Sequence, residues 1–511
     1  MILTPAMLGV LYMMLCICNL RQSIWFDESF SSYLTRFDLG QIWNMTAADV
    51  HPPLYYFILK AWAHIFGHTD FAMRMLSVIL GAAAILFAFL WLKYKYGSRA
   101  AFLGSFLLSI SPVFIRYGQE MRMYTMVVAI VFAATYFLQL AVDNGKKRWW
   151  IIYTVLVAAG MWTHYFTAFA FCAHLVYLFK IYGKSFWKKM IWAPYLLAVL
   201  LFSPWMPSLF SQVSNVQSNG FWVSPVSVSV MANYFSEDLF YMKADEIQNW
   251  LLVLAAITVS IILFFAIRYR KQMVMLLSMA IIPLALLVLL SLPPLSPMFI
   301  PRYILYAMLA IPIIAGVGLA ILTHDPALIA KKDKKCRLKR LALIGVYISI
   351  MIALVGSSII GLSAVYAKGN YNMYTDTKSA SKELYNFIIN MDNGDNLPII
   401  SNSEWLYYDM AAYTSEEHPI LFIDELVDYR YGSLEPLKRS YFGRIKNLDE
   451  WLNIHEGFWF VGSAPENPYE QYLEFPRAGW KVTEVSNMKF NDHSDTYQIL
   501  KLERDESYNN D

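Results

Sequence analysis

The chain opens with ILTPAMLGVLYMMLCICNLRQSIWFDESF, residues 2–30, in which an uncharged apolar run over 2–20 is followed closely by two adjacent carboxylates, Asp27 and Glu28. An apolar run of this length is typical of a helix that crosses a lipid bilayer. No basic segment precedes it and no small-residue cleavage site follows it, so we interpret it as a retained first span. The paired acids are then expected at a membrane surface, directly after that span.

The composition extends this interpretation to most of the chain. Of its 511 residues, 58% are hydrophobic and only 15% are charged, which indicates an integral membrane protein. The formal net charge of +3 is small and gives no sign of a nucleic-acid-binding surface. About eleven apolar segments are expected to span the membrane: 2–20, 75–92, 100–115, 123–142, 149–162, 165–180, 190–206, 250–267, 273–292, 303–322 and 341–366. The shorter segment 54–67 contains Lys60 and His64 and is interpreted as interfacial or re-entrant.

The loops between these segments differ in charge. One alternate set holds twenty Lys and Arg residues, whereas the other set, although longer, holds eight. By the positive-inside rule, the first set is cytoplasmic. We therefore expect a multi-pass plasma-membrane protein whose N-terminus is cytoplasmic and whose C-terminal part is extracytoplasmic.

The composition changes to that of a soluble domain at about residue 367. Helical patterns in 379–391, 404–413 and 448–454 alternate with strand patterns in 396–403, 418–424, 457–463 and 497–504. This order suggests a small α/β domain. The expected architecture is an α-helical polytopic membrane domain over 1–366, with about eleven transmembrane helices, and an extracytoplasmic α/β domain over 367–511. The second domain looks more like a cover or recognition domain than the place of the reaction.

The outer loops of the membrane part hold the groups capable of chemistry. Adjacent residues on a helix project about 100° apart, so we expect one of Asp27 and Glu28 to face a reaction and the other to anchor the loop. The plainer interpretation is that both acids mark the end of a span and face water.

Three further outer motifs accompany the acids. In ADVHPPLYYFILK, residues 48–60, the two prolines force His51 out of the helical region and create a fixed bend. RYGQEMRMY, residues 116–124, places two arginines on the side of the membrane where the charge bias disfavours them. SLPPLSPMFIPRYILY, residues 291–306, delivers Arg302 after a proline-rich loop, and arginine suits phosphate recognition.

The order of these motifs carries a resemblance. Asp27-Glu28, then Asp49-Val-His51-Pro-Pro-Leu, then Gln119-Glu120-x-Arg122-x-Tyr124, then Pro301-Arg302-Tyr303 resembles the GT-C superfamily of polyprenyl-phosphate-sugar-dependent glycosyltransferases. Within it, the chain is most similar to the dolichyl-phosphate-mannose protein mannosyltransferases and the bacterial aminoarabinose transferases. The resemblance covers residues 1–366 by topology and motif order, and the C-terminal domain is similar to that of several bacterial members.

The resemblance implies the reaction and its partners. The donor would be a sugar on a polyprenyl phosphate held in the bilayer, and the acceptor an extracytoplasmic glycan, lipid or protein of the cell envelope. Asp27 would act as the base, with Glu28 beside it. The phosphate would be bound by arginines, first Arg302 and Arg122 and then Arg74 and Arg116. The acceptor or its loop would be ordered by His51, Glu120 and Tyr124. A divalent metal ion is left open, with Glu28, His51 and Glu120 as candidate ligands.

Two observations keep alternatives open. The protein mannosyltransferases continue HPPLGK, whereas this chain reads HPPLYY, so transfer to a glycolipid or polymer is at least as compatible as transfer to a protein. A polyprenyl-linked sugar flippase or transporter would also have many spans and basic head-group sites. It would need polar residues at mid-span, where the segments of this chain read as apolar.

Overall fold

The computed structural model describes most of the chain and divides it into two compact units. The described residues are 3–187, 189–219, 223, 225–323, 334–369, 371–372, 377–401, 403–414, 417–424, 443–463, 479–491, 494 and 496–505. One unit, here called the helical unit, comprises 1–20, 51–58 and 71–368. The other, here called the sheet unit, comprises 21–50, 59–70 and 369–511. Most of the first outer loop thus belongs to the same unit as the C-terminal domain.

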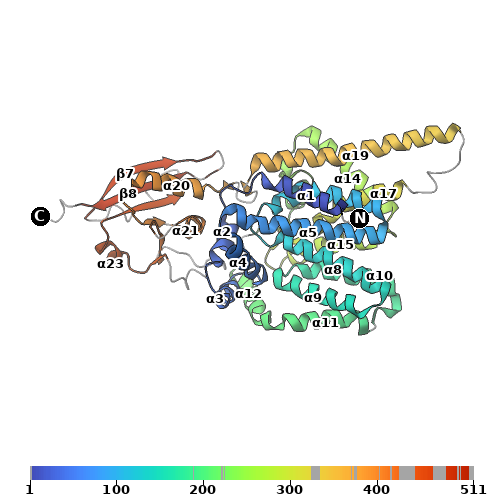
Figure 1. Ribbon diagram of the computed structural model, residues 1–511, viewed down its shortest axis with the longest axis horizontal. Coiled ribbons are helices and arrows are strands. Elements are labelled where there is room, and N and C mark those ends of the chain that lie inside the picture. The colour runs from blue at the N-terminus through green and yellow to red at the C-terminus, as the bar shows by residue number, and fades with distance from the viewer. Residues whose placement is uncertain are drawn as a thin grey trace. The chain divides into compact units, whose positions relative to one another are not determined.

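The helical unit consists of helices joined by short connections (Figure 1). Its α-helices are α1 (Leu3–Ile17), α5 (Asp70–Tyr96), α6 (Ser98–Ser109), α7 (Pro112–Gly118), α8 (Tyr124–Asn144), α9 (Lys147–Thr163), α10 (Thr167–Tyr182), α11 (Lys189–Phe202), α12 (Met206–Asn219), α13 (Val228–Phe240), α14 (Asn249–Arg268), α15 (Val274–Leu290), α16 (Leu305–Met308), α17 (Ala310–Leu322) and α19 (Lys334–Lys368). Its 3₁₀ helices are η1 (Gly183–Trp187), η2 (Ser203–Trp205), η3 (Ala244–Glu246) and η4 (Pro301–Ile304).

Each of the eleven predicted apolar segments falls on helix, which confirms a polytopic helical membrane fold. Within the described residues, six helices are long and apolar enough to cross a bilayer, and the pair α6 and α7, bent by 61°, can count as a seventh. Helices α1 and α15 are apolar but shorter. Segment 54–67 forms α4 (Leu54–Phe66), and its interfacial placement stays a prediction. Residues 331–333 of the last basic cluster lie outside the described residues.

Small residues allow two helices of this unit to approach each other closely. Helices α6 and α17 pack with Gly316 directly against Gly104, and a Cβ atom added at Gly316 would lie 2.6 Å from the backbone nitrogen of Gly104. Close backbone approach through glycine is the usual way in which helices associate where lipid removes the hydrophobic drive.

The span interiors are less uniformly apolar than the sequence suggested. His174, fully buried in α10, has its Nε2 atom 3.0 Å from the Thr135 hydroxyl and its Nδ1 atom 3.0 Å from the Tyr153 hydroxyl. Tyr153 lies in turn 2.8 Å from the hydroxyl of Tyr195. The chain of polar groups therefore connects α8, α10, α9 and α11, and it satisfies the imidazole that burial would otherwise leave unpaired.

The sheet unit contains a six-stranded mixed sheet in the order β5-β4-β3-β6-β8-β7. Strands β3 to β6 run parallel, whereas β6–β8 and β8–β7 pair antiparallel, and β7 and β8 form the long pair in Figure 1. The elements are α2 (Phe26–Leu34), α3 (Leu39–Ala48), β1 (Tyr371–Asn372), β2 (Thr377–Lys378), α20 (Ser381–Asp392), β3 (Ile399–Ser401), α21 (Glu404–Ala411), β4 (Ile420–Ile423), β5 (Arg444–Ile445), α23 (Leu448–Asn453), β6 (Gly457–Ser463), β7 (Trp480–Met488) and β8 (Tyr497–Arg504).

This sheet confirms the predicted α/β domain, since every helix and strand expected from the sequence is present. Its core is formed by side chains from the strands and α23: Ile400, Ile423, Ile445, Leu448, Leu452, Phe458, Phe460, Trp480, Leu500 and Leu502. Strand β7 was missed. It is an edge strand in which only Trp480 is buried among residues that alternate between half-buried and exposed, so its sequence lacks a repeating apolar face.

The glycine contact between α6 and α17 predicts a specific cost for added volume. Gly316→Val should lower the thermal unfolding midpoint of the purified protein, because overpacking of this kind costs about 1–3 kcal/mol. Gly345→Ala in α19 is the matched control, since no heavy atom lies within 4 Å of the Cβ that it adds. Equal midpoints for the two variants would show that the α6–α17 contact does not limit stability.

Candidate functional site

All four predicted arginines lie buried in the helical unit. Three of them are called here the arginine cluster: Arg116, Arg122 and Arg302, with exposed fractions of 2%, 3% and 5%. Prolines position two of them. Pro112 starts α7, which ends with Arg116 in its last turn, and Pro301 starts η4, which presents Arg302. Arg122 lies in the connection between α7 and α8. Buried guanidinium groups require compensating partners.

Arg116 has an acidic partner and an aromatic one. Its Nη2 atom lies 2.8 Å from Oε1 of Glu120, one helical turn further on, and both side chains are buried. Its guanidinium also lies over the ring of Tyr241 at 5.9 Å. Glu120 therefore neutralises one member of the arginine cluster.

Aromatic rings line the other two arginines. Arg302 lies over the ring of Tyr124 at 5.7 Å, and Arg122 donates a hydrogen bond of 3.2 Å to the hydroxyl of Tyr56. Tyr56 belongs to α4, directly after the HPP bend. The structure thus brings residues from three of the predicted motifs into one site, because the bend, the 116–124 connection and η4 all meet there.

Two histidines extend the site beyond these arginines. The ring centroids of His51 and His164 lie 5.7 Å apart. The His164 centroid lies 5.0 Å from that of Tyr303 and 6.4 Å from that of Tyr124. Burial, followed by the charges of His51, Arg122 and Arg302, holds the pKa of His164 well below its ordinary value. His164 is therefore a neutral imidazole within an otherwise basic site. The sequence shows it only as the polar interruption THYFT between two apolar segments.

The structure adds two carboxyl groups that sequence reasoning missed, Glu237 and Asp238 on α13. The Tyr117 hydroxyl donates a hydrogen bond of 2.9 Å to Oε1 of Glu237, and the Tyr117 ring packs edge-on against Tyr124 at 5.3 Å. Burial raises the pKa of Glu237 to about 7, although the Tyr117 hydrogen bond and the Arg302 and Arg116 charges act in the opposite direction.

Asp238 is also buried, and its pKa is raised well above the ordinary value by burial and by the neighbouring charge of Glu237. The raised pKa values of both carboxyl groups therefore favour their protonated forms. The available sequence signal was an adjacent acid pair, SEDLF, flanked by apolar residues at helical spacing.

Two predicted residues have mainly structural contacts. Arg74 is fully buried, and its Nη1 atom donates a 3.0 Å hydrogen bond to the carbonyl of Leu20 at the end of the first apolar run. Gln119 donates to the Cys16 carbonyl at 3.1 Å and receives a hydrogen bond from Asn19 at 3.4 Å. These contacts attach the 116–124 connection and the start of α5 to the end of that run.

The predicted acids lie in the sheet unit, at the start of α2. Glu28 is fully buried, and its side chain accepts a long hydrogen bond of 3.4 Å from the Trp25 backbone nitrogen, which closes the N-terminus of the helix. Asp27 is half-buried on the same first turn. Negative charge at a helix N-terminus is favourable, so both acids stabilise α2.

The candidate metal ligands do not form a cluster. Among the described residues, no three His, Cys, Asp or Glu side chains gather in a way that could hold a metal ion, and this includes Glu28, His51 and Glu120. Structural and catalytic sites for transition metals usually supply at least three such side chains. We therefore derive no step through a metal ion.

Part of the chain matches a known protein family. Residues 50–207 match the family model described as dolichyl-phosphate-mannose-protein mannosyltransferase, a range that includes the HPP bend and the 116–124 connection. YkcB of Bacillus subtilis strain 168, provisionally named a mannosyltransferase, is 25% identical over 140 residues. That match spans 27% of this chain and 20% of YkcB.

Solved structures resemble the chain over a much greater length. ArnT from Cupriavidus metallidurans, bound to undecaprenyl phosphate, aligns with a TM-score of 0.61 and 13% identity, covering 98% of this chain and 97% of that one. The oligosaccharyltransferase AglB from Archaeoglobus fulgidus, in complex with an inhibitory peptide and a dolichol-phosphate, aligns with a TM-score of 0.51 and 13% identity, covering 90% and 69%. The fold that the resemblance implies is thereby confirmed, because the chain shares the fold of these solved proteins.

The raised pKa of Glu237 predicts how stability depends on pH. The folded protein keeps this proton up to about pH 7, whereas an unfolded chain releases it near 4.5. Through Glu237 alone, the free energy of unfolding should therefore fall by about 3 kcal/mol as the pH rises from 4.5 to 7, and this contribution should then stay level. Glu237→Gln keeps an acceptor for Tyr117 and should remove this dependence. Thermal unfolding of both proteins between pH 4.5 and 8 measures the difference, and parallel curves would contradict the prediction.

Proposed function

We propose that this protein is a membrane glycosyltransferase that moves a sugar from a polyprenyl-phosphate donor to an acceptor at the extracytoplasmic face. The observation that carries the proposal is the arginine cluster, in which three buried guanidinium groups lie among aromatic rings and beside Glu120. Buried guanidinium groups of this kind suit an anionic head group. The fold supports the same assignment, since a solved protein of this fold holds undecaprenyl phosphate.

The donor explains why the site lies in a bundle of membrane helices. A long isoprenoid chain keeps the donor in the bilayer, so an enzyme that uses it must open to lipid. Arg302 and Arg122, backed by Tyr124 and Tyr56, would bind the phosphate, and Arg116 would add positive charge although Glu120 compensates part of it. In this assignment Arg74 contributes less than the others, because its guanidinium is engaged by the Leu20 carbonyl.

The reaction would be a single inverting displacement at the anomeric carbon. Asp27 takes the proton of an acceptor hydroxyl, whose oxygen forms the new glycosidic bond. The bond between the anomeric carbon and the phosphate oxygen breaks at the same time, and the electron pair leaves with the polyprenyl phosphate. The arginine cluster stabilises the charge that develops on this leaving group. Glu28 would keep α2 in place through its contact with the Trp25 backbone.

The acceptor and the remaining residues complete the proposal. His51, Glu120 and Tyr124 would order the acceptor loop around the site. The acceptor would be a glycan, lipid or protein of the cell envelope, with the N-terminus of the enzyme cytoplasmic and residues 367–511 extracytoplasmic. The sequence HPPLYY in place of HPPLGK directs the first tests toward glycolipid and polymer acceptors.

Release of free polyprenyl phosphate tests this function directly. Membranes containing the protein should release it from one of a panel of polyprenyl-phosphate sugars when a cell-envelope extract supplies acceptors. Asp27→Asn should lower the rate by about 10²- to 10⁴-fold, since it removes the base. Arg302→Ala should lower it by about 10²- to 10³-fold, since it removes charge stabilisation.

The controls for this experiment are exposed residues of the same types. Asp245→Asn and Arg270→Ala replace an exposed acid and an exposed arginine and should leave the rate unchanged. Absence of release from every donor, together with protein-dependent passage of labelled lipid-linked sugar across the bilayer, would contradict a transferase and favour a flippase.

A further inference from the structure

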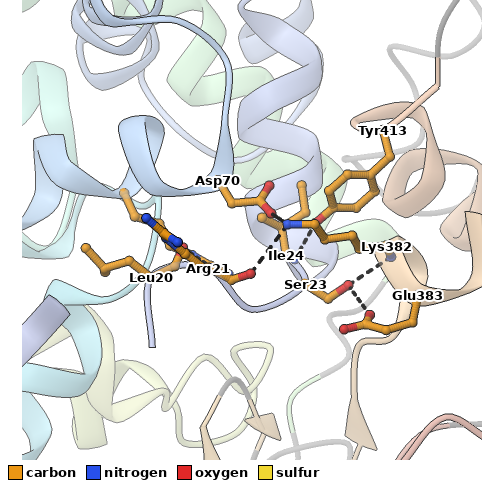
Figure 2. A network of polar contacts seen from close by, with 9 residues as sticks. Leu20, Arg21, Ser23, Ile24, Asp70, Lys382, Glu383 and Tyr413 are labelled. Carbon is orange, nitrogen blue, oxygen red and sulfur yellow. Dashed lines mark hydrogen bonds and ion pairs between the residues drawn. The ribbon is translucent and has the colours of Figure 1, made fainter. Parts of the chain in front are cut away.

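The segment that leads into α2 is bound by residues from the far end of the chain. Figure 2 shows Ser23 between two residues of α20: its hydroxyl donates to Oε2 of Glu383 at 3.0 Å and accepts from the Lys382 backbone nitrogen at 2.9 Å. The next residue, Ile24, donates its backbone N–H to the Tyr413 hydroxyl at 2.8 Å. Tyr413 follows α21 directly, so the backbone just before α2 has partners from two elements of the C-terminal domain.

The side chain of Lys382 connects the two ends of the first outer loop. Its ammonium group lies 2.9 Å from Oδ2 of Asp70 and 3.5 Å from the carbonyl of Arg21, and it lies 5.9 Å from the centre of the Tyr413 ring. The beginning and the end of the loop that contains α2 are thus held at one point (Figure 2).

One face of α2 packs against α21 along its whole length. The ring centroids of Phe26 and Trp405 lie 4.3 Å apart. The ring centroid of Tyr408 lies 5.9 Å from that of Phe30 and 5.2 Å from that of Tyr33. A polar contact lies within this aromatic interface, because the hydroxyl of Ser29 donates to Oδ1 of Asp409 at 2.6 Å. After the helix ends, Arg36 donates to the backbone carbonyl of Ala411.

This packing fixes the rotation of α2 about its own axis. The contact residues at 26, 29, 30 and 33 repeat at helical spacing and define the face turned to α21. Asp27 lies about 100° around the helix from Phe26, and Glu28 lies about 200° around it. A rotation of α2 would therefore redirect the Asp27 carboxylate, and the α21 contacts oppose that rotation.

The length of α2 makes these contacts necessary. A helix of nine residues is too short to be stable by itself in water. Its own N-terminal contact through Glu28 is long, at 3.4 Å. The aromatic and polar interface with α21 therefore contributes to the free energy that keeps α2 helical.

We propose that the C-terminal domain is the positioning element for Asp27, and that Asp409 and Tyr413 are the positioning residues that hold α2 in its working orientation. The inference rests on the proposed function, because it assigns the domain a part in the same reaction. It changes the expected role of residues 367–511 from a cover or recognition domain to a scaffold for the catalytic helix. Neither residue needs to touch the substrate.

Steady-state kinetics of polyprenyl phosphate release test this proposal in the full-length protein. Asp409→Ala should lower kcat by about 10- to 100-fold, because a small misplacement of a reacting group is costly, while the donor KM changes less than twofold. Asp409→Asn keeps an acceptor for Ser29 and should recover most of the activity. Tyr413→Phe removes only the hydroxyl that binds Ile24, and it should lower kcat in the same way with little effect on folding.

A double-variant measurement separates positioning from general stability. If Asp409 acts through Asp27, Asp409→Ala should cause little further loss in an Asp27→Asn background, because the group that it positions is already gone. Asp449→Ala and Tyr385→Phe, which lie elsewhere in the same domain, are the matched controls and should keep full kcat. The thermal unfolding midpoint of each variant should be recorded beside its rate.

The possible failures are distinguishable. Loss of activity in Asp27→Asn with unchanged kcat in both Asp409→Ala and Tyr413→Phe would overturn the positioning role and leave the proposed function intact. The positioning role would also be overturned if Asp409→Ala lowered kcat by the same factor in the wild-type and in the Asp27→Asn background. Full activity of Asp27→Asn would overturn Asp27 as the base, and the positioning role with it.

Discussion

Burial of positive charge is the constraint on which the helical unit depends. A guanidinium group cannot lose its charge, so each arginine removed from water needs a carboxylate, a carbonyl, an aromatic face or a ligand. The chain supplies Glu120 for Arg116, the face of Tyr124 for Arg302 and the hydroxyl of Tyr56 for Arg122. The Arg122–Tyr56 and Arg302–Tyr124 contacts also tie together α4, the connection between α7 and α8, the start of α8, and η4.

The same charge balance explains the protonation of the neighbouring groups. His164 stays neutral because burial disfavours its charged form, and the charges of His51, Arg122 and Arg302 add to that effect. For Glu237 the two effects oppose each other. Burial favours its neutral form, whereas the arginines favour its charged form, and its pKa is about 7. Ionisation of one carboxyl group is therefore enough to change the net charge beside Arg302.

Sequence patterns predicted the fold better than they predicted the site. Apolar run length located helices, because the bilayer imposes a long apolar run on each span. Among the described residues, however, only six helices, or seven with the bent pair, are long and apolar enough to cross a bilayer. The helix break after α6 and the short α7 were not visible, since residues 100–115 read as one apolar run although Pro112 starts a new helix at a bend of 61°. Motif order placed His51, Arg122 and Arg302 on one side, but only the packing of η4 and α7 could show which rings lie beside them. Glu237 and Asp238 escaped notice because their environment, and not their spacing, makes them unusual.

The pairing of α2 with α21 also constrains how the protein can be made. Ser29 and Asp409, which share a hydrogen bond, are separated by 380 positions in the chain. At ordinary rates of synthesis the ribosome needs roughly 20 to 80 s to add a segment of that length. During this time α2 lacks its packing partner while the intervening helices are inserted into the bilayer. The helix that carries Asp27 can therefore reach its folded form only when the rest of the polypeptide is nearly complete, so a truncated product would lack an ordered acid.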